Sequence, residues 1–452
     1  MVSQRVKTTV LVLAVLLLVL AMSVEEASAT LKVQKRTAEL TISGGRVVDS
    51  RGNAVILRGV NMYGYQSGYW WGHQESDYAL IASWGFNVVR LPIAWNYIEP
   101  TPGYYDDSYF SNYVDRDIGW AQRNSIYVIL DMHQDGWSPH FTFPGWQQNG
   151  LPAWAVSGYP DNQEGLTKAR QDFWNGLGPN GSQPNDSNPS LQDRLAAAWK
   201  HVASRYAGNS VIAGFDLFNE PPPAGLQGFG TEILPAFYTK MIDSIRSADP
   251  NRICVWEEGD NLAYPTAPPK RPNLIYSTHY PGGYGDSYGG VAALTADLQT
   301  ELSASQSWGM PLFIGEWGVV DTYSALAQYI NDNLALYDQY GIGSAWWAYS
   351  KEGDFGMYLF DGHNNLRTSI TNCLVRPYLV GYANSVTVTS SHFDASSRVL
   401  QVDLQSVGEL PVSVPSSFSI ISTANIASTT RAGKYTVVLT PADQASSIQI
   451  QF

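Results

Sequence analysis

Two glutamates end hydrophobic runs, an unusual place for a charged side chain. Glu220 lies in GFDLFNEPPP (214–223) and Glu316 lies in PLFIGEWG (311–318). The prolines after Glu220 cannot continue a central strand, so the run reads as a buried strand that ends at a carboxylate. Two carboxylates that face each other can protonate a leaving oxygen and attack an anomeric carbon or activate water, which is the chemistry of glycosidic bond cleavage.

Eight short hydrophobic runs recur along the chain, and most are continuous rather than alternating, as parallel strands buried on both faces read. Amphipathic helical patterns that stop at Gly or Pro separate them. This order predicts an α/β fold, a (β/α)8 TIM barrel. A doubly wound open sheet is the rival, but the Gly-rich phosphate turn that it usually carries is missing. The runs are 58–64, 87–93, 126–133, 214–220, 252–259, 274–281, 311–318 and 343–350.

Every run ends in polar or aromatic side chains that could do chemistry. In a barrel the carboxyl-terminal strand ends meet at one face, where active sites are built. Glu220 and Glu316 end the fourth and seventh strands, which lie on roughly opposite sides of the mouth, so we expect them to face each other. The strand-end residues are Asn61, Arg90, His133, Asn219, Glu220, Glu257, Glu258, His279, Glu316 and Trp347.

One connection, residues 138–190, is far longer than a barrel loop needs, and it follows the third strand. It is rich in Gly, Pro, Asn and Trp, and long structureless insertions are usually functional or disordered. Either its tryptophans line a cleft, or they pack the loop onto the barrel. Asn180 and Asn185 begin glycosylation sequons, which would mark exposed surface. The tryptophans in or beside this loop are Trp137, Trp146, Trp154 and Trp174.

The termini differ in character from the middle of the chain. Residues 1–29 show basic residues, an apolar run and ASA before Thr30, the pattern of a secretory signal peptide, and the apolar run is short for a membrane anchor. We expect a barrel at 30–382. Residues 383–452 alternate polar and apolar side chains, which predicts a small antiparallel β-sandwich. Because this segment holds no Trp, we expect it to stabilise the barrel rather than to bind sugar.

Composition excludes several partners. The net charge is −13, and the 27 Lys and Arg form no basic run, which argues against nucleic acid and anionic membranes as binding partners.

The mature protein is expected to be a secreted monomer without stable membrane insertion after signal cleavage. Neither Cys254 nor Cys373 has neighbours typical of a nucleophile or metal ligand, and a disulfide between them is the less favoured alternative. No cofactor or metal is expected.

Taken in order, seven motifs give a resemblance to family five glycoside hydrolases, the cellulase-type retaining barrels, over about residues 40–380. The motifs are RGVN, VVRLP, DMHQD, LFNEP, STHYP, GEWG and WWAYS. The resemblance implies Glu220 as acid/base and Glu316 as nucleophile. It also implies Arg90 beneath Glu316, Asn219 on the sugar 2-hydroxyl, Trp347 as floor of the sugar subsite, and His133 and His279 as binders of sugar hydroxyls that orient the carboxylates.

Physical chemistry supports the assignment of the pair. A nucleophile needs a low pKa and an acid a raised one, so we expect the arginine to keep Glu316 ionised and Glu316 to push Glu220 toward protonation. Glu257 and Glu258 form a rival site, of which only one can face the mouth. Many relatives have a tyrosine where this chain has Pro281, so Tyr280 or Tyr284 is expected to contact the nucleophile instead.

Two substrates fit this resemblance. The chain is similar to endoglycoceramidases in DMHQD with Asp135, in LPAWAV, in LVRPY and in its trailing β-domain. That branch tends to have a lysine after the first strand, which NMYGYQ lacks. The sequence therefore narrowly favours endo-β-1,4-glucanase activity, with glycoceramide cleavage as the close alternative. A sugar-binding protein without catalysis is the alternative of another class, which the intact glutamate pair argues against.

Overall fold

The computed structural model describes residues 37–68, 72–143, 149–258, 266–283 and 287–452. The expected signal peptide lies outside these residues. Ala38–Phe452 form one compact unit.

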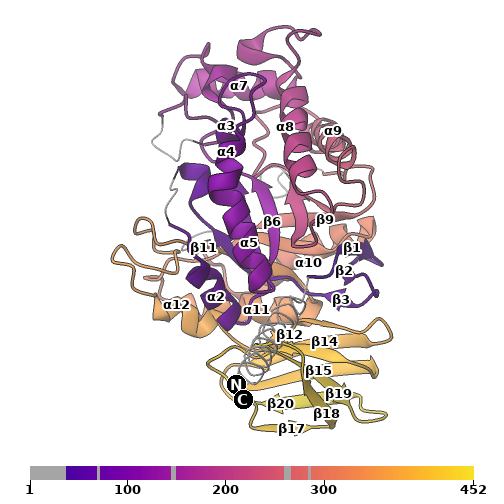
Figure 1. Cartoon of the computed structure of the whole chain (residues 1–452). Coiled ribbons are helices and arrows are strands. Elements are labelled where there is room, and N and C mark those ends of the chain that lie inside the picture. Colours follow the sequence, from indigo (N-terminus) through magenta and orange to yellow (C-terminus); the bar gives the residue numbers. More distant parts are fainter. Residues whose placement is uncertain (1–36, 69–71, 144–148, 259–265, 284–286) are drawn as a thin grey trace, which may run out of the picture. The chain divides into compact units, whose positions relative to one another are not determined.

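Eight parallel strands close into a barrel, which confirms the predicted fold class and all eight predicted strands (Figure 1). Hydrogen bonds join them in the cyclic order of the chain, with β11 pairing back to β4. The strands are β4 (Arg58–Met62), β5 (Val88–Ile93), β6 (Tyr127–Met132), β7 (Ile212–Asp216), β8 (Cys254–Glu257), β9 (Leu274–His279), β10 (Leu312–Trp317) and β11 (Gly343–Tyr349).

Helices fill the connections between the strands and cover the outside of the barrel (Figure 1). The longest described ones follow β6, β7, β9 and β10 in the chain. The described part of the connection from β8 to β9 contains no helix. The helices of the barrel are α2 (Glu75–Ser83), α3 (Trp95–Ile98), α4 (Asp107–Tyr109), α5 (Asp115–Arg123), α6 (Ala153–Val156), α7 (Gln163–Trp174), α8 (Leu191–Arg205), α9 (Leu234–Arg246), α10 (Val291–Trp308), α11 (Leu326–Tyr340) and α12 (Thr368–Leu374).

Inside the barrel the side chains change from apolar to charged along most strands, whereas β4 carries Asn61 and β11 carries Trp347. Because a strand turns every second residue inward, Val88 and Arg90 share the inner face of β5, and Ile129 and Asp131 share that of β6. The lowest inner row is a fully apolar layer. Charged residues are therefore held one row above it, near the carboxyl-terminal ends.

A hairpin of β1 (Leu40–Ser43) and β2 (Arg46–Asp49) packs against the lowest apolar row. Leu40 and Val47 are its buried contributions to that cluster. The hairpin pairs through β3 (Ala54–Val55) with β13 (Gly381–Tyr382). The amino-terminal end of the barrel is thus closed by chain that precedes its first strand.

The sequence suggested a long loop without regular structure at 138–190, but the connection does contain regular structure. It contains α6, α7 and a 3₁₀ turn at Pro179–Gly181. Trp137 and Trp174 are buried, and Trp154 packs edge to face against Trp95, so these three pack the loop onto the barrel. Trp146 lies outside the described residues. Both sequon asparagines are exposed.

The carboxyl-terminal segment forms the predicted sandwich of two four-stranded antiparallel sheets around its own apolar core. One strand of the first sheet, β12, lies just before residue 383. The strands are β12 (Tyr378–Leu379), β16 (Leu410–Ser413), β19 (Thr436–Pro441) and β18 (Ile426–Arg431) in one sheet, and β14 (Thr387–Asp394), β15 (Val399–Ser406), β20 (Ser447–Gln451) and β17 (Ser422–Ala424) in the other.

Two further sequence questions are answered by the structure. Cys254 is buried and Cys373 is partly buried, and both are free thiols. Among the described helices, none has the length and apolar character needed to cross a bilayer.

Candidate active site

Arg90 on β5 stands at the centre of the barrel and is fully buried. Its guanidinium lies 2.8 Å from Glu316, 2.8 Å from Asp216, 3.0 Å from Asp131 and 3.1 Å from Glu257. Burial lowers the pKa of Arg90, but the four carboxylates outweigh this and raise it well above its usual value. One arginine thus contacts carboxylates from four different strands. The sequence had predicted only its contact with Glu316.

Glu316 ends β10 and is nearly inaccessible to solvent. Arg90 donates to its Oε1, and the Tyr280 hydroxyl donates to its Oε2 at 3.0 Å. Burial raises the pKa of Glu316 to about 7, against the opposite effects of His279 and Arg90 and with a further increase from Glu220. The expected arginine contact is present, but the expected low pKa is wrong because desolvation of a buried carboxylate is the larger effect.

Tyr280 answers the question that Pro281 raised. Its backbone adopts φ of +50°, and its N–H donates to the Glu316 carbonyl at 2.8 Å. Because of this left-handed turn directly after β9, the phenol of residue 280 reaches the Glu316 carboxylate. The contacting tyrosine thus lies one position before Pro281. Tyr284 lies outside the described residues.

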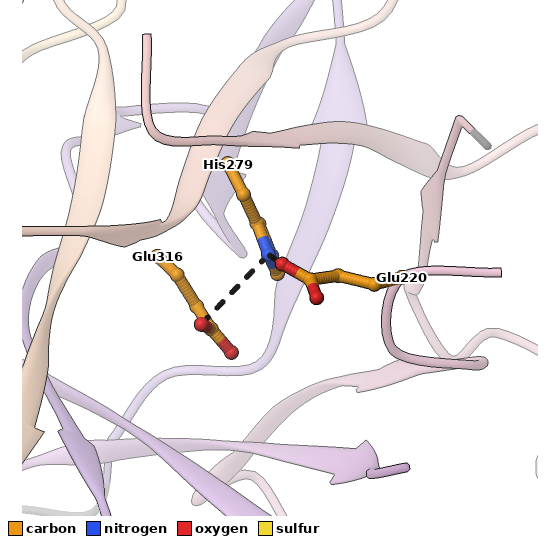
Figure 2. Close-up of side chains that lie close together, drawn as sticks. All are labelled: Glu220, His279 and Glu316. Atoms are coloured by element: carbon orange, nitrogen blue, oxygen red, sulfur yellow. Dashed lines mark hydrogen bonds and ion pairs between the residues drawn. The ribbon is translucent and has the colours of Figure 1, made fainter. Parts of the chain in front are cut away.

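Glu220 lies just beyond β7, and its side chain is 49% exposed. Its Oε1 lies 2.9 Å from Nδ1 of His279, which ends β9. Figure 2 shows the imidazole of His279 between the carboxylates of Glu220 and Glu316. One ligand-type atom from each of these three residues lies within 4.8 Å of the others. The two carboxylates therefore face each other across the mouth, as the sequence predicted.

His279 contacts carboxylates through both ring nitrogens. Besides the Glu220 contact, Nδ1 lies 3.9 Å from Glu316, and Nε2 lies 3.3 Å from Glu257. Burial lowers the pKa of His279, but Glu257 and Glu316 outweigh it and raise the pKa well above its usual value. An imidazolium has no lone pair for a metal ion, so we interpret the three converging residues as a proton-bearing, hydrogen-bonded set.

His133 is fully enclosed rather than open to a ligand. Nδ1 lies 2.6 Å from Asp131, and Nε2 lies 3.2 Å from Asp135. The ring stacks on Trp347 at 5.4 Å with an interplanar angle of 9°. Burial lowers the pKa of His133, but Asp135 and Asp131 outweigh it and raise the pKa well above its usual value. Its place is beneath the mouth, with Asp135, one quarter exposed, above it.

Trp347 ends the inner row of β11. It is 7% exposed, and its ring meets Tyr63 edge to face at 5.9 Å. Met357 and Tyr358 complete a small apolar cluster around it. Trp347 is thus held on one side by the stacked His133 and on another by aromatic side chains, which fixes the plane of its indole.

Asn219 is buried, and its side chain is bonded within the protein. Its Oδ1 accepts from Arg90 at 2.9 Å, and its Nδ2 donates to the Gln134 carbonyl at 3.0 Å. Asn61 supports the same centre from β4, since its Oδ1 accepts from Arg90 and its Nδ2 donates to the Gly315 carbonyl.

Sequence reasoning underestimated Glu257 and missed Asp131 and Asp216. Glu257 ends β8 and faces the mouth, while the next residue, Glu258, is buried and interacts with Tyr276 and Glu301. The alternation of strand residues could have found Asp131, which precedes His133 by two positions, and Asp216, which ends β7. No sequence signal shows that all of them meet one arginine.

The comparisons with known proteins agree with this geometry. The family model described as cellulase (glycosyl hydrolase family 5) matches residues 48–353. Endoglycoceramidase I of Rhodococcus hoagii (strain 103S) is 27% identical over 263 residues, 52% of this chain and 50% of that protein. Endoglucanase N of Pectobacterium atrosepticum is 26% identical over 319 residues, 69% of this chain and 56% of that protein. The chain thus spans about half the length of these two relatives.

The likeness in structure extends further along the chain. Endo-glycoceramidase II from Rhodococcus sp., solved as a complex with ganglioside GM3, aligns with a TM-score of 0.75 and 23% identity. The alignment covers 90% of this chain and 99% of that chain. At this identity, the match shows a shared fold.

Proposed function

Because the chain belongs to glycosyl hydrolase family 5, and is therefore a glycoside hydrolase, we propose that it cleaves β-glucosidic bonds with retention, using Glu220 and Glu316. The observation that carries the proposal is their separation, since a carboxylate oxygen of each lies within 4.8 Å of the other. Retaining enzymes hold the two carboxyl groups about 5–5.5 Å apart, whereas inverting enzymes need roughly 6.5–9.5 Å to admit a water.

In the proposed reaction Glu316 attacks the anomeric carbon while Glu220 gives its proton to the departing oxygen, so that one bond forms as the other breaks. Water then attacks the glycosyl ester, gives a proton to Glu220 and releases Glu316. Arg90 and Tyr280 hold Glu316 in position. Asn219 has a second amide N–H for the sugar 2-hydroxyl.

Trp347 and the partly exposed Asp135 are the proposed sugar-binding residues. The indole of Trp347 supplies an apolar face for the sugar ring, and the Asp135 carboxylate accepts from sugar hydroxyls. His133 lies beneath both, since it stacks on Trp347 and contacts Asp135. We therefore assign His133 to holding these two residues rather than to contacting the sugar.

For the substrate, we propose a glycolipid whose sugar is released from ceramide. Trp137 and Trp174 are buried and Trp154 packs on Trp95, so the described tryptophans of the long loop offer no stacking platforms for a glucan chain. Phe143 and Phe355, 38% and 37% exposed, belong to the connections that leave the carboxyl-terminal ends of β6 and β11. Exposed aromatic side chains there suit an apolar aglycone. The fold shared with an endoglycoceramidase is consistent with this choice.

A β-1,4-glucan is the second candidate, which the sequence narrowly favoured. The match to the cellulase family model and the endoglucanase relative support it. Both substrates place a β-linked glucose next to the cleaved bond, so the same carboxylate pair serves either.

The test is to incubate the purified protein with lactosylceramide in detergent and, separately, with carboxymethyl-cellulose. Released ceramide without new reducing ends in the cellulose assay supports the glycolipid proposal. The reverse result would replace it with a glucanase. The variant E316Q should lose more than ~10³-fold of either activity because it removes the nucleophile.

The matched control for E316Q is E301Q. Burial first, and Glu258 second, raise the pKa of Glu301 to about 8. Its carboxyl group is therefore mostly protonated at neutral pH, and a glutamine of the same shape should keep full activity. An active E316Q would overturn the assignment of the nucleophile.

We further propose that the protein is secreted after cleavage behind Ala29. Amino-terminal sequencing of the exported protein should begin at Thr30, and a protein that retains the leader would contradict this.

A further inference from the structure

The backbone of Glu220 is in a conformation that needs support. Its φ is +43°, in the left-handed region that non-glycine residues seldom adopt. Pro221 follows directly and disfavours the right-handed helical conformation at Glu220. The side chain is half exposed, so packing around the carboxylate does not fix it. Its position must therefore come from contacts to the backbone and to its few polar neighbours.

Two buried side chains from neighbouring strands hold this backbone on both sides. The N–H of Glu220 donates to Oε2 of Glu257 at 2.7 Å. Its carbonyl accepts from Nε2 of Gln134 at 3.0 Å, and the same amide donates to the Asn219 carbonyl at 2.9 Å. Glu257 is at the end of β8, and Gln134 lies two residues beyond the end of β6.

We propose that Glu257 and Gln134 are positioning residues that clamp the backbone of Glu220 and so place its carboxyl group for proton transfer. The inference rests on the proposed function, because it gives Glu220 the acid/base role. It adds two residues that act through Glu220, either on its backbone or through His279, which contacts its side chain.

Glu257 also reaches the Glu220 side chain through His279. Its Oε1 lies 3.3 Å from Nε2 of His279, whose Nδ1 contacts the Glu220 carboxylate. Burial works to raise the pKa of Glu257, but His279, Arg90 and the Glu220 N–H outweigh it and the pKa lies below its usual value. An ionised Glu257 thus holds both the main chain of Glu220 and the imidazole bonded to its side chain.

The charge of Glu257 is not needed to neutralise Arg90. Three other carboxylates, those of Asp131, Asp216 and Glu316, already lie within 3.0 Å of that guanidinium. A further buried carboxylate there carries a desolvation cost. Its distinct contacts are those to Glu220 and His279, which is why we assign its role to them.

The test compares two aryl β-cellobiosides in wild-type protein and the isosteric variant E257Q. The 2,4-dinitrophenyl group departs without a proton, whereas the phenyl group requires one. Because general acid catalysis contributes about 10²–10⁴-fold, we expect E257Q to lower kcat/KM for the phenyl substrate by about 10- to 100-fold. The dinitrophenyl substrate should lose less than about 3-fold. E258Q, the same change one residue further along the chain, is the control and should alter neither.

Equal losses on both substrates, or no loss on either, would overturn the clamp. The variant Q134M, which removes the other half, should show the same selective loss and replaces E257Q if that protein does not fold. The variant E220A separates the two hypotheses. If E220A lowers kcat/KM mainly for the phenyl substrate but E257Q and Q134M do not, only the clamp is wrong. If the wild-type protein cleaves neither substrate, or if E220A loses as much on the dinitrophenyl substrate as on the phenyl substrate, the proposed function is wrong.

Discussion

At the scale of the residue, the site contains more carboxylates than positively charged groups to neutralise them. Arg90 serves four of them. Burial, together with Glu257 and Asp131, raises the pKa of Asp216 well above its usual value, although Arg90 opposes this. A proton on Asp216 would relieve part of the excess negative charge. His133 and His279 offset the remaining negative charge. The pKa of Glu316 therefore depends on these two histidines as well as on Arg90.

The pH dependence of activity should report Glu316. It must be ionised to attack, and burial raises its pKa to about 7, so activity is present above that pKa and is lost as the pH falls through it. We expect the acid limb of kcat/KM on 2,4-dinitrophenyl β-cellobioside near pH 7, because this substrate does not depend on the acid. A limb near pH 4.5, where an ordinary glutamate titrates, would contradict the desolvated environment.

Tyr280 should move that limb. Its hydroxyl donates to Glu316 Oε2, and a hydrogen bond to the ionised form favours it. We expect Y280F to shift the acid limb to higher pH and to lower kcat/KM at neutral pH by about 10-fold, measured on the same substrate. Y288F removes a hydroxyl bonded to Asp332 outside the site, and it should leave the limb in place. An unshifted acid limb in Y280F would show that the Tyr280 hydroxyl does not stabilise the ionised form of Glu316.

The sequence identified the residues whose strand-end positions are regular, and it was less informative where the backbone departs from regularity. Arg90 was predictable because strand alternation points it inward with Val88. Glu316 was predictable because it ends a hydrophobic run, although the register of β10 shifts between Ile314 and Glu316. Tyr280 was not, because a left-handed turn decides which tyrosine reaches the nucleophile. The clamp on Glu220 was not predictable either, since Gln134 acts through a side chain bonded to a distant main chain.

At the scale of the element, the apolar bottom row and the hairpin beneath it support the charged row. The hairpin precedes the barrel in the chain, and only its contacts show that it belongs to the barrel core. The helix α7 was equally hidden, because the Gly and Pro around it gave the whole connection the composition of a loop. Composition averaged over a long window conceals a short regular element within it.

The hairpin should contribute to stability without touching the reaction. Leu40 is 5% exposed and packs into the lowest row of the barrel, so L40A should lower the free energy of unfolding by about 2–4 kcal/mol through lost burial and a cavity. Urea unfolding measures this. S43A, exposed on the same strand, should change it by less than ~0.5 kcal/mol. Equal stability of L40A and wild type would show that the hairpin does not close the core.

At the scale of the whole molecule, a buried charge cluster connects the barrel to the chain that enters the sandwich. Asp338 on α11 accepts from Arg58 of β4 and from Arg376, each at 2.6 Å. The Arg58 guanidinium also lies over the ring of Tyr378 in β12, and the Tyr378 hydroxyl donates to the Gly85 carbonyl at 3.0 Å. The sequence predicted a sandwich that stabilises the barrel, and these contacts give that prediction a mechanism.

Neutralising Asp338 should therefore weaken both parts together. D338N leaves two arginines buried without a carboxylate, which costs about 3–5 kcal/mol, and thermal unfolding followed by near-ultraviolet circular dichroism should show one transition at a lower Tm. D243N removes the partner of Arg271 at the surface, where both side chains are over a third exposed, and it should leave the Tm nearly unchanged because solvent screens such a pair. If D338N instead unfolds in two separated steps, the cluster couples the two parts rather than only stabilising them, and an unchanged Tm would exclude both roles.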